Sequence, residues 1–246
     1  MAEAPRERNI QTFNADTAAL GGYVYTAIDR WSSKCATGRQ TEELAQLLKA
    51  HFPPTVRIAD VGCGDGTFTV DLAEKFRPAS IRGVDPASNA IAAGRARIPP
   101  HLAGSVSFEV GDIYNVENKG EDLAIGRGVL HHVDRLEDAI ARMAQQFKTV
   151  IILDPNGFNP VLKVIEKVSP YHRKHDEKSW APSRITRAFK SHGFTVVSMK
   201  YFVLVPYFCP TPLAKFLSKC EPIVEAVPGV REISCGSILA LYQRGY

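Results

Sequence analysis

The sequence lacks the features that would place it in a membrane or a secreted class. No apolar run approaches the roughly 18 consecutive residues that a membrane-spanning helix needs. The first eight residues, Met-Ala-Glu-Ala-Pro-Arg-Glu-Arg, contain no apolar stretch of the kind that secretory signals carry. No Cys-x-x-Cys pair is present, and the five cysteines are scattered: Cys35, Cys63, Cys209, Cys220 and Cys235. We therefore expect a cytoplasmic protein with reduced thiols.

A strong excess of one charge is also absent. The formal net charge is only +4 over 246 residues, and 45% of the residues are hydrophobic, which is typical of a globular chain with a full core. Residues 160–200 hold nine Lys or Arg against three Asp or Glu, so the basic character lies mainly there. That segment is either a basic patch or a solvated face. We expect no nucleic-acid partner, because the overall charge is too small to favour one.

A short apolar run that is broken by glycines is the most informative stretch. Residues 56–66 read Val-Arg-Ile-Ala-Asp-Val-Gly-Cys-Gly-Asp-Gly. The β-branched residues predict a buried strand, and the alternate glycines predict a tight turn before a helix. Glycines there adopt backbone conformations closed to other residues and let a ligand approach the main chain. The stretch predicts a ligand cradle at Gly62, Gly64 and Gly66.

An acidic residue follows the next apolar run at an informative distance. The apolar run over residues 81–84 is followed directly by Asp85, which lies roughly 20 residues after the glycine turn. In a doubly wound sheet, the carboxyl ends of the first two strands lie side by side, so Asp85 can accept hydrogen bonds from both hydroxyls of a ribose. The alternative is a strand-end residue that caps a helix starting near Ser88.

Strand-like runs alternate with helical patterns along the chain. Further strands are predicted over residues 106–110, 122–125 and 150–153, which indicates an α/β fold with a mostly parallel sheet covered on both faces. Ligands of such sheets bind at the carboxyl ends of the strands. Polar residues fall at or just past these ends: Asp60, Asp85, Asp112, Arg127, His131 and Asp154.

Four segments in a fixed order carry a family resemblance. They are Asp60-Val61-Gly62-Cys63-Gly64-Asp65-Gly66, Asp85, Gly111-Asp112-Ile113 and Val129-Leu130-His131-His132-Val133. Over about residues 55–155 the chain resembles class I S-adenosylmethionine-dependent methyltransferases of the small-molecule type, similar to sugar and natural-product O-methyltransferases. A nicotinamide site fits less well, because Gly64-Asp65-Gly66-Thr67 does not supply the Gly-x-Gly-x-x-Gly fingerprint.

The resemblance implies a fold, a cofactor and a set of binding residues. The fold is a Rossmann-like sheet of seven strands, the last inserted antiparallel beside the sixth, with residues 195–200 and 237–242 as the candidates for those two. The cofactor is S-adenosylmethionine. The resemblance assigns the methionine portion to Asp60, Gly62, Cys63 and Gly64, the ribose to Asp85, the adenine to Asp112 and Ile113, and a backbone contact with the site to Arg127.

The chemistry of a sulfonium methyl donor suggests which residues act on the acceptor. The methyl group is already activated, so the protein has to align the acceptor and, for a hydroxyl, remove a proton. His131 is the candidate base, and Asp154 is the candidate to orient it, a pairing that resembles some sugar O-methyltransferases. The alternative is that one histidine ties the strand end to the following loop, with His132 favoured for that role.

No metal is expected. Asp154 and Asn156 have no further carboxylate cluster beside them in the sequence, and we expect the adjacent His131 and His132 to point in different directions.

The domain organisation separates a lid from the core. We expect an amino-terminal lid or extension over residues 1–40, beginning with a frayed polar lead over residues 1–16, and a methyltransferase domain over 41–246 whose first helix starts at Thr41. Acceptor-side insertions are expected at about 158–182 and 202–234. In the first, the polar and aromatic residues 171–180 either recognise an anionic or sugar acceptor or form a solvated loop. The second completes an apolar pocket, dimerises or touches a membrane.

These observations predict an enzyme that methylates a hydroxyl of a sugar or natural product, working as a monomer or homodimer on a small-molecule acceptor. Three alternatives stay open: an N- or C-methyltransferase, an enzyme acting on a lipid-linked acceptor at the membrane surface, and a non-catalytic domain that binds S-adenosylmethionine to regulate a partner.

Overall fold

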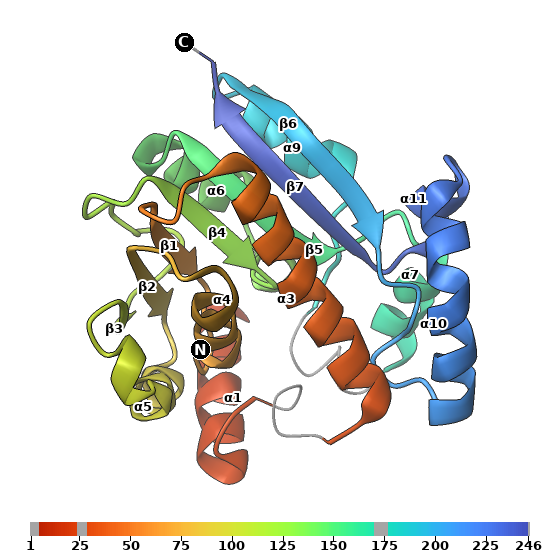
Figure 1. The fold of residues 1–246 in the computed structure, drawn as a ribbon, viewed down its shortest axis with the longest axis horizontal. Helices are drawn as coiled ribbons and strands as arrows, with labels where there is room; N and C mark the ends of the chain where they lie inside the picture. Colours follow the sequence, from red (N-terminus) through yellow and green to blue (C-terminus); the bar gives the residue numbers. More distant parts are fainter. Residues whose placement is uncertain (1–4, 24–28, 170–176, 246) are drawn as a thin grey trace.

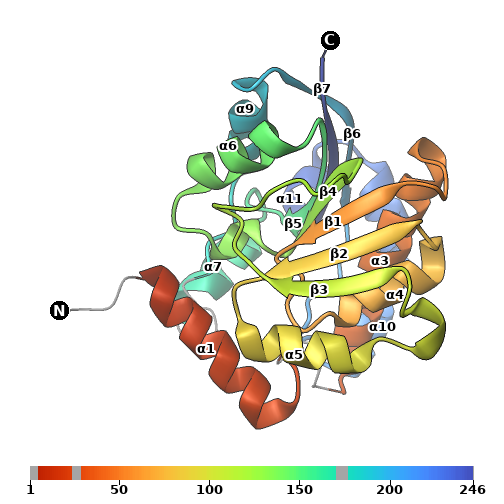
Figure 2. The same cartoon turned by 90° about the vertical axis from the view of Figure 1, so that its left-hand side faces the viewer.

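The structure, a computed structural model, describes residues 5–23, 29–169 and 177–245. A seven-stranded sheet in the order β3-β2-β1-β4-β5-β7-β6 forms its centre, with helices on both faces (Figures 1 and 2). The strands are β1 (Arg57–Val61), β2 (Ser80–Asp85), β3 (Val106–Val110), β4 (Leu123–Arg127), β5 (Thr149–Pro155), β6 (Phe194–Phe202) and β7 (Ser237–Arg244).

The first five strands run parallel, and β7 lies antiparallel between β5 and β6. This confirms the predicted sheet, including the last strand inserted beside the sixth. A bulge between Val196 and Ser198 shifts the pairing of β6 with β7. The parallel order places the carboxyl ends of β1, β2, β4 and β5 along one edge, which is where a ligand of this fold binds.

The two faces of the sheet carry separate sets of helices. One set is α3 (Trp31–His51), α4 (Thr67–Phe76) and α5 (Ser88–Arg97), and the other is α6 (Leu136–Gln146) and α9 (Pro182–Lys190). Near the ends of β6 and β7 lie α7 (Pro160–Val168), α10 (Thr211–Ala226) and α11 (Val230–Ser234) (Figure 1). Two 3₁₀ turns, η1 (Pro100–Leu102) and η2 (Leu130–His132), complete the described elements.

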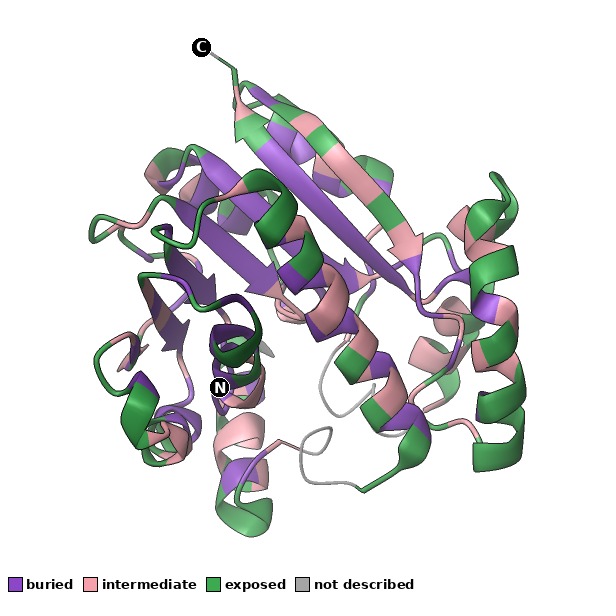
Figure 3. Ribbon diagram, in the orientation of Figure 1, coloured by how far each residue is buried: buried purple, intermediate pink, exposed green. Residues whose placement is uncertain are grey.

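Apolar side chains fill both layers between sheet and helices. Ile58, Ile81 and Leu123 point to the α3–α4–α5 side, whereas Ile140 and Phe189 pack on the α6–α9 side, and all five are essentially inaccessible to water. The buried central strands of Figure 3 agree with the near-continuous apolar runs of the sequence.

The amino-terminal region corrects two sequence predictions. Residues expected to form a frayed polar lead make helix α1 (Pro5–Leu20), which packs against α5. Helix α3 begins at Trp31 rather than at Thr41, so Thr41 lies inside the helix and does not cap it. The sequence shows an apolar helical pattern only after residue 41. The first turns of α3 are mostly polar, and their buried residues are covered by contacts with the rest of the fold.

Among the described residues, no helix is both long and apolar enough to cross a membrane. All five cysteines are free thiols.

Candidate functional site

A cavity of about 630 Å³ opens at the carboxyl edge of the sheet. Its walls include every residue that the sequence assigned to cofactor or catalysis: Asp60, Gly62, Cys63, Gly64, Asp85, Asp112, Ile113, Arg127, His131 and Asp154. Helix α1 and the segment after it add Arg6, Phe13 and Tyr23 to the lining, while α7, the β6–α10 loop and α11 supply a largely apolar wall. The cavity therefore has a polar half over the glycine turn and an apolar half beside the late insertions.

The glycine turn brings bare backbone to the cavity. Gly62 (φ +79°) and Gly64 (φ +58°) have conformations that L side chains rarely adopt. A Cβ on Gly62 would lie 2.3 Å from Cγ2 of Val129, and one on Gly64 would lie 2.5 Å from the ring of Tyr23. Both positions therefore require glycine for conformation and for space.

Asp85 is tied to the same turn. Its Oδ2 accepts a hydrogen bond from Gly64 N at 2.9 Å, and its Oδ1 accepts one from Ala87 N at 2.9 Å. Burial raises the pKa of Asp85 to about 6. Helix α5 begins one residue beyond Ala87 without a side-chain cap, so Asp85 orders the turn before the helix.

One carboxylate oxygen of Asp60 is available to accept a hydrogen bond from a ligand. Its Oδ2 accepts a 2.6 Å hydrogen bond from the Thr69 hydroxyl at the start of α4. Its Oδ1 is buried and has no hydrogen-bond partner among the described residues. Burial raises the pKa of Asp60, and a cationic ligand group beside the carboxylate would lower it again.

The guanidinium of Arg127 does more than the sequence suggested. It donates to the Thr41 hydroxyl at 2.8 Å and to the Thr37 carbonyl at 3.1 Å, and it lies 4.0 Å from the ring centroid of Phe68. Burial lowers its pKa to about 10. Arg127 therefore fastens the end of β4 to α3, a role that no spacing rule identifies because Thr37 and Thr41 are distant in sequence.

Asp112 is clamped from both sides. Its Oδ1 accepts from Tyr114 N at 2.9 Å, and its Oδ2 accepts from Arg6 Nε at 2.9 Å. Arg6 lies on α1, and Tyr23, after α1, donates its backbone N–H to Asp65 at 3.1 Å. The amino-terminal segment is thus held at the cavity by Asp112, which the resemblance assigned to the adenine, and by Asp65 of the glycine turn.

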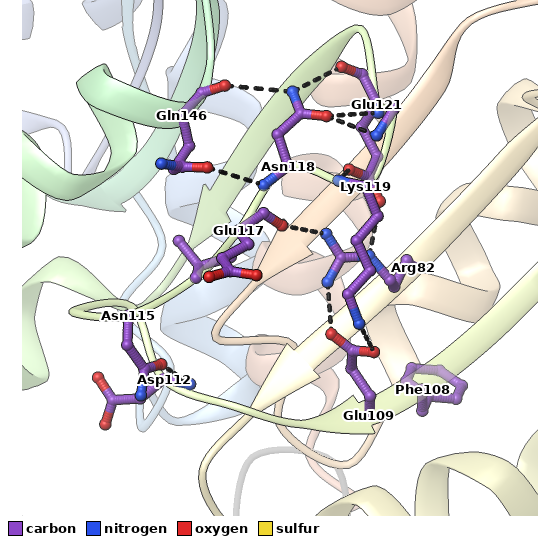
Figure 4. A network of polar contacts seen from close by, with 12 residues as sticks. Arg82, Phe108, Glu109, Asp112, Asn115, Glu117, Asn118, Lys119, Glu121 and Gln146 are labelled. Carbon is purple, nitrogen blue, oxygen red and sulfur yellow. Dashed lines mark hydrogen bonds and ion pairs between the residues drawn. The ribbon is translucent and has the colours of Figure 1, made fainter.

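A polar network that sequence reasoning missed holds the β3–β4 loop (Figure 4). Arg82 donates to Glu121 and to Glu109, both at 2.6 Å, and to the Glu117 carbonyl at 2.8 Å. Asn118 links the loop to Gln146 of α6. In the sequence, this network could have been suspected only from Arg82, a charged residue inside the apolar run of β2. The network anchors the loop that begins with Asp112 and Ile113.

His131 and Asp154 form a buried pair at the far side of the cavity. Nδ1 of His131 lies 3.1 Å from Oδ1 of Asp154. Burial lowers the pKa of His131, but the charge and hydrogen bond of Asp154 outweigh this effect and leave the pKa raised. Of the two adjacent histidines, it is His131 that contacts the end of β5.

His132 lies beside His131 rather than away from it. The ring centroids are 3.9 Å apart, so the expectation that the two point in different directions is wrong. Their 3₁₀ turn places both rings on one side, where a ligand atom of each lies within 4.8 Å of one of Glu177. Asn156, the other residue considered for a metal, donates to the carbonyls of Glu232 and Cys235 and is structural.

Residues 177–180 join this part of the site. Lys178 N donates to the His131 carbonyl at 2.9 Å, and Trp180 Nε1 donates to the Leu130 carbonyl at 2.7 Å. The rest of the segment expected to recognise an acceptor, residues 171–176, lies outside the described residues.

Comparison with known proteins finds similarities to methyltransferases in the central part of the chain. Residues 58–150 match the family described as "Methyltransferase domain". The trans-aconitate 2-methyltransferase of Variovorax paradoxus is 28% identical over 137 residues, which cover 55% of this chain and 48% of that protein. The magnesium-protoporphyrin O-methyltransferase of Rhodobacter capsulatus is 46% identical over 77 residues, covering 31% and 34%. The matches thus span about half or less of these curated relatives.

Solved structures are similar over the whole chain. The magnesium protoporphyrin IX methyltransferase from Synechocystis PCC 6803 with bound SAM has a TM-score of 0.70 and 14% identity, with 99% of each chain covered. The geranyl diphosphate C-methyltransferase from Streptomyces coelicolor A3(2) has a TM-score of 0.63 and 16% identity, with full coverage of both chains. At these identities the likeness concerns the fold.

Proposed function

We propose that the chain is a class I, S-adenosylmethionine-dependent methyltransferase, as the match of residues 58–150 to the methyltransferase domain family supports, and that it transfers the methyl group to an oxygen of a small molecule. The observation that carries the proposal is the polar half of the cavity, where Asp60, the glycine turn and Asp85 lie together.

The residues present fit this cofactor. The open Oδ1 of Asp60 suits the ammonium group of the methionine portion, which would also favour the ionised carboxylate. Bare backbone at Gly62 and Gly64 admits the ligand where a Cβ would clash. Asp85 would accept hydrogen bonds from ribose hydroxyls, and Asp112 with Ile113 would contact the adenine. When bound, the cofactor supplies a methyl group on a positively charged sulfur.

The amino-terminal segment is proposed to act as a lid. Arg6 contacts Asp112, and the phenol of Tyr23 lies 3.5 Å from Asp85. These contacts close α1 and its following turn over the polar half of the cavity and would exclude water from it.

His131 is proposed to take the proton from an acceptor hydroxyl. Asp154 fixes the orientation of the imidazole through Nδ1, which leaves Nε2 to receive a proton. The pair is buried and lines the same cavity as the proposed cofactor residues, so an acceptor in that cavity could reach the imidazole. The proposed acceptor is an apolar natural product that carries one reacting hydroxyl; the largely apolar wall supports this more than it supports a sugar.

A carboxylate is the second candidate acceptor. The name of the Variovorax relative specifies an organic acid, trans-aconitate. A carboxylate is already ionised at neutral pH, so its methylation needs no base, and His131 would then only position groups. The two candidates differ in how strongly the rate depends on His131.

Two measurements test the proposal. Calorimetric titration with S-adenosylmethionine should show binding, and no heat at millimolar cofactor would overturn the cofactor assignment. Transfer of a labelled methyl group should then be screened over apolar hydroxylated compounds and over carboxylic acids. Replacing His131 by Asn should abolish turnover of a hydroxyl acceptor while cofactor affinity stays; loss of cofactor affinity alone would contradict the role as base.

A further inference from the structure

The three helices of the late insertions bury almost none of their side chains. Helices α7 and α11 contain no buried residue, and α10 buries only Ala214 and Glu221. A helix on a globular protein normally turns an apolar stripe to the core. Here much of the apolar material faces outward, which marks an interaction surface.

The outward side chains are regularly spaced. On α10 and just after it, Leu213, Phe216, Ile223 and Val227 form one helical stripe at intervals of three, seven and four residues, and they are between 43% and 70% exposed. Helix α11 packs against both α10 and α7, and each of the three helices carries exposed apolar residues (Figure 1). We call the whole set the outer apolar face: Val161, Val164, Val168, Leu213, Phe216, Ile223, Val227, Val230 and Ile233.

The charges of α10 are sorted by sign, whereas on α11 the partly exposed Glu232 pairs with Arg231. The acids of α10, Glu221 and Glu225, turn inward and pair with Arg39 at 2.7 Å. The lysines remain outside: Lys167 and Lys219 have no ion pair within the described ranges of the chain, and Lys215 Nζ lies 5.9 Å from the ring of the partly exposed Trp31. Lysines beside exposed Phe and Trp are typical of helices that lie on an anionic membrane surface.

The same helices form the apolar wall of the cavity. Leu162 and Ile165 of α7, Ile233 of α11, and Val205 with Phe208 before α10 all line the space that contains His131. Val161 and Ile233 belong both to the outer apolar face and to the cavity lining, so the face is continuous with the apolar wall of the cavity.

We propose that the outer apolar face docks on an anionic lipid bilayer and that the acceptor is a lipophilic molecule that enters the cavity from that bilayer. The docking stands on the surface alone, whereas the acceptor class rests on the proposed function. A second copy of the chain is disfavoured as the occupant. In a two-fold interface the same patch meets itself, so Lys215 and Lys219 would be brought toward their own copies, whereas anionic lipid neutralises them.

Vesicle sedimentation of the full chain tests the docking. Vesicles of phosphatidylcholine with phosphatidylglycerol should carry the protein down, and pure phosphatidylcholine should carry much less. The double variant Phe216→Ser/Ile223→Ser should lower the partition coefficient at least tenfold, and Lys215→Gln/Lys219→Gln should lower it on the order of tenfold. The matched controls are Val197→Ser and Lys190→Gln, which lie outside the outer apolar face and should sediment like the parent.

Two further measurements distinguish failure of the membrane docking from failure of the proposed methyltransferase function. Circular dichroism and S-adenosylmethionine affinity should be unchanged in all four variants, because the substituted positions lie outside the cavity lining. Absence of sedimentation, or sedimentation that neither double variant reduces, would overturn the docking even if methyl transfer is found. A dimer in analytical ultracentrifugation that Phe216→Ser/Ile223→Ser dissociates, without vesicle binding, would assign the face to a second copy instead.

Discussion

Nδ1 of His131 lies 3.1 Å from Oδ1 of Asp154, and this contact joins the turn after β4 to the end of β5 inside the cavity. Asp154 belongs to β5, and His131 lies in the η2 turn that follows the neighbouring parallel strand β4, so the pairing of these two strands brings the residues close together. In this pair a buried carboxylate holds an imidazole, which can accept a proton, in a fixed orientation.

The first prediction concerns the pH dependence of methyl transfer to a hydroxyl. A base must be neutral, and Asp154 raises the pKa of His131, so the rate should rise with pH through a value above 6.5. Asp154→Asn removes the two strongest effects that raise the pKa of His131, its charge and its hydrogen bond, and leaves burial, which lowers the pKa, opposed only by the charges of Glu177 and Glu166. The rising limb of kcat should therefore move to lower pH, and kcat should fall on the order of tenfold or more. A profile that stays unchanged in Asp154→Asn would rule out the coupling.

The second prediction concerns cofactor affinity. The pKa of Asp85 is raised to about 6, so its carboxylate takes up a proton below that pH and loses acceptors for the ribose hydroxyls. The Kd for S-adenosylmethionine should rise toward about tenfold per pH unit below pH 6. Asp85→Asn should weaken binding by a factor of ten or more at pH 7.5 and remove this dependence. Titration calorimetry measures both, with Asp138→Asn, an exposed carboxylate remote from the cavity, as the control.

The third prediction concerns the glycine turn. Gly62→Ala forces an L residue into a left-handed conformation and drives its Cβ against Val129. The free energy of unfolding should fall by about 2 kcal/mol or more, and cofactor binding should be lost or strongly weakened. Urea denaturation provides the measurement. Gly104→Ala is the matched control, because a Cβ there meets nothing within 4 Å, and a comparable loss in that variant would contradict the argument.

The fourth prediction concerns the network around Arg82. The Glu121 side chain is only 7% exposed, so Arg82→Met leaves it without its buried partner. Stability should fall by about 3 kcal/mol, and cofactor affinity should drop because the loop that carries Asp112 loosens. Lys119→Met removes an exposed partner of Glu109 and should cost less than about 1 kcal/mol. Equal losses of unfolding free energy in Arg82→Met and Lys119→Met would show that burial of the ion pair does not determine its contribution to stability.

The sequence by itself determined the first five strands of the sheet, the glycine turn and the residues along the carboxyl edge, whereas the last two strands came from the family resemblance. These follow from local rules: apolar runs predict strands, and a glycine turn between Val61 and Thr67 requires conformations that other residues avoid. Asp85 and Asp112 were found because parallel strands end at a common edge.

Only the tertiary structure decided what the local pattern leaves open. The amino-terminal residues 5–16 are polar and carry no clear helical stripe, and their helix is fixed by contacts such as Arg6 with Asp112. The partners of Arg127 and Arg82 lie far away in sequence. The sequence of an apolar helix such as α10 shows the same pattern whether its apolar stripe faces the core or the solvent. Whether the apolar stripe faces the core or the solvent depends on how the helix packs against the rest of the chain.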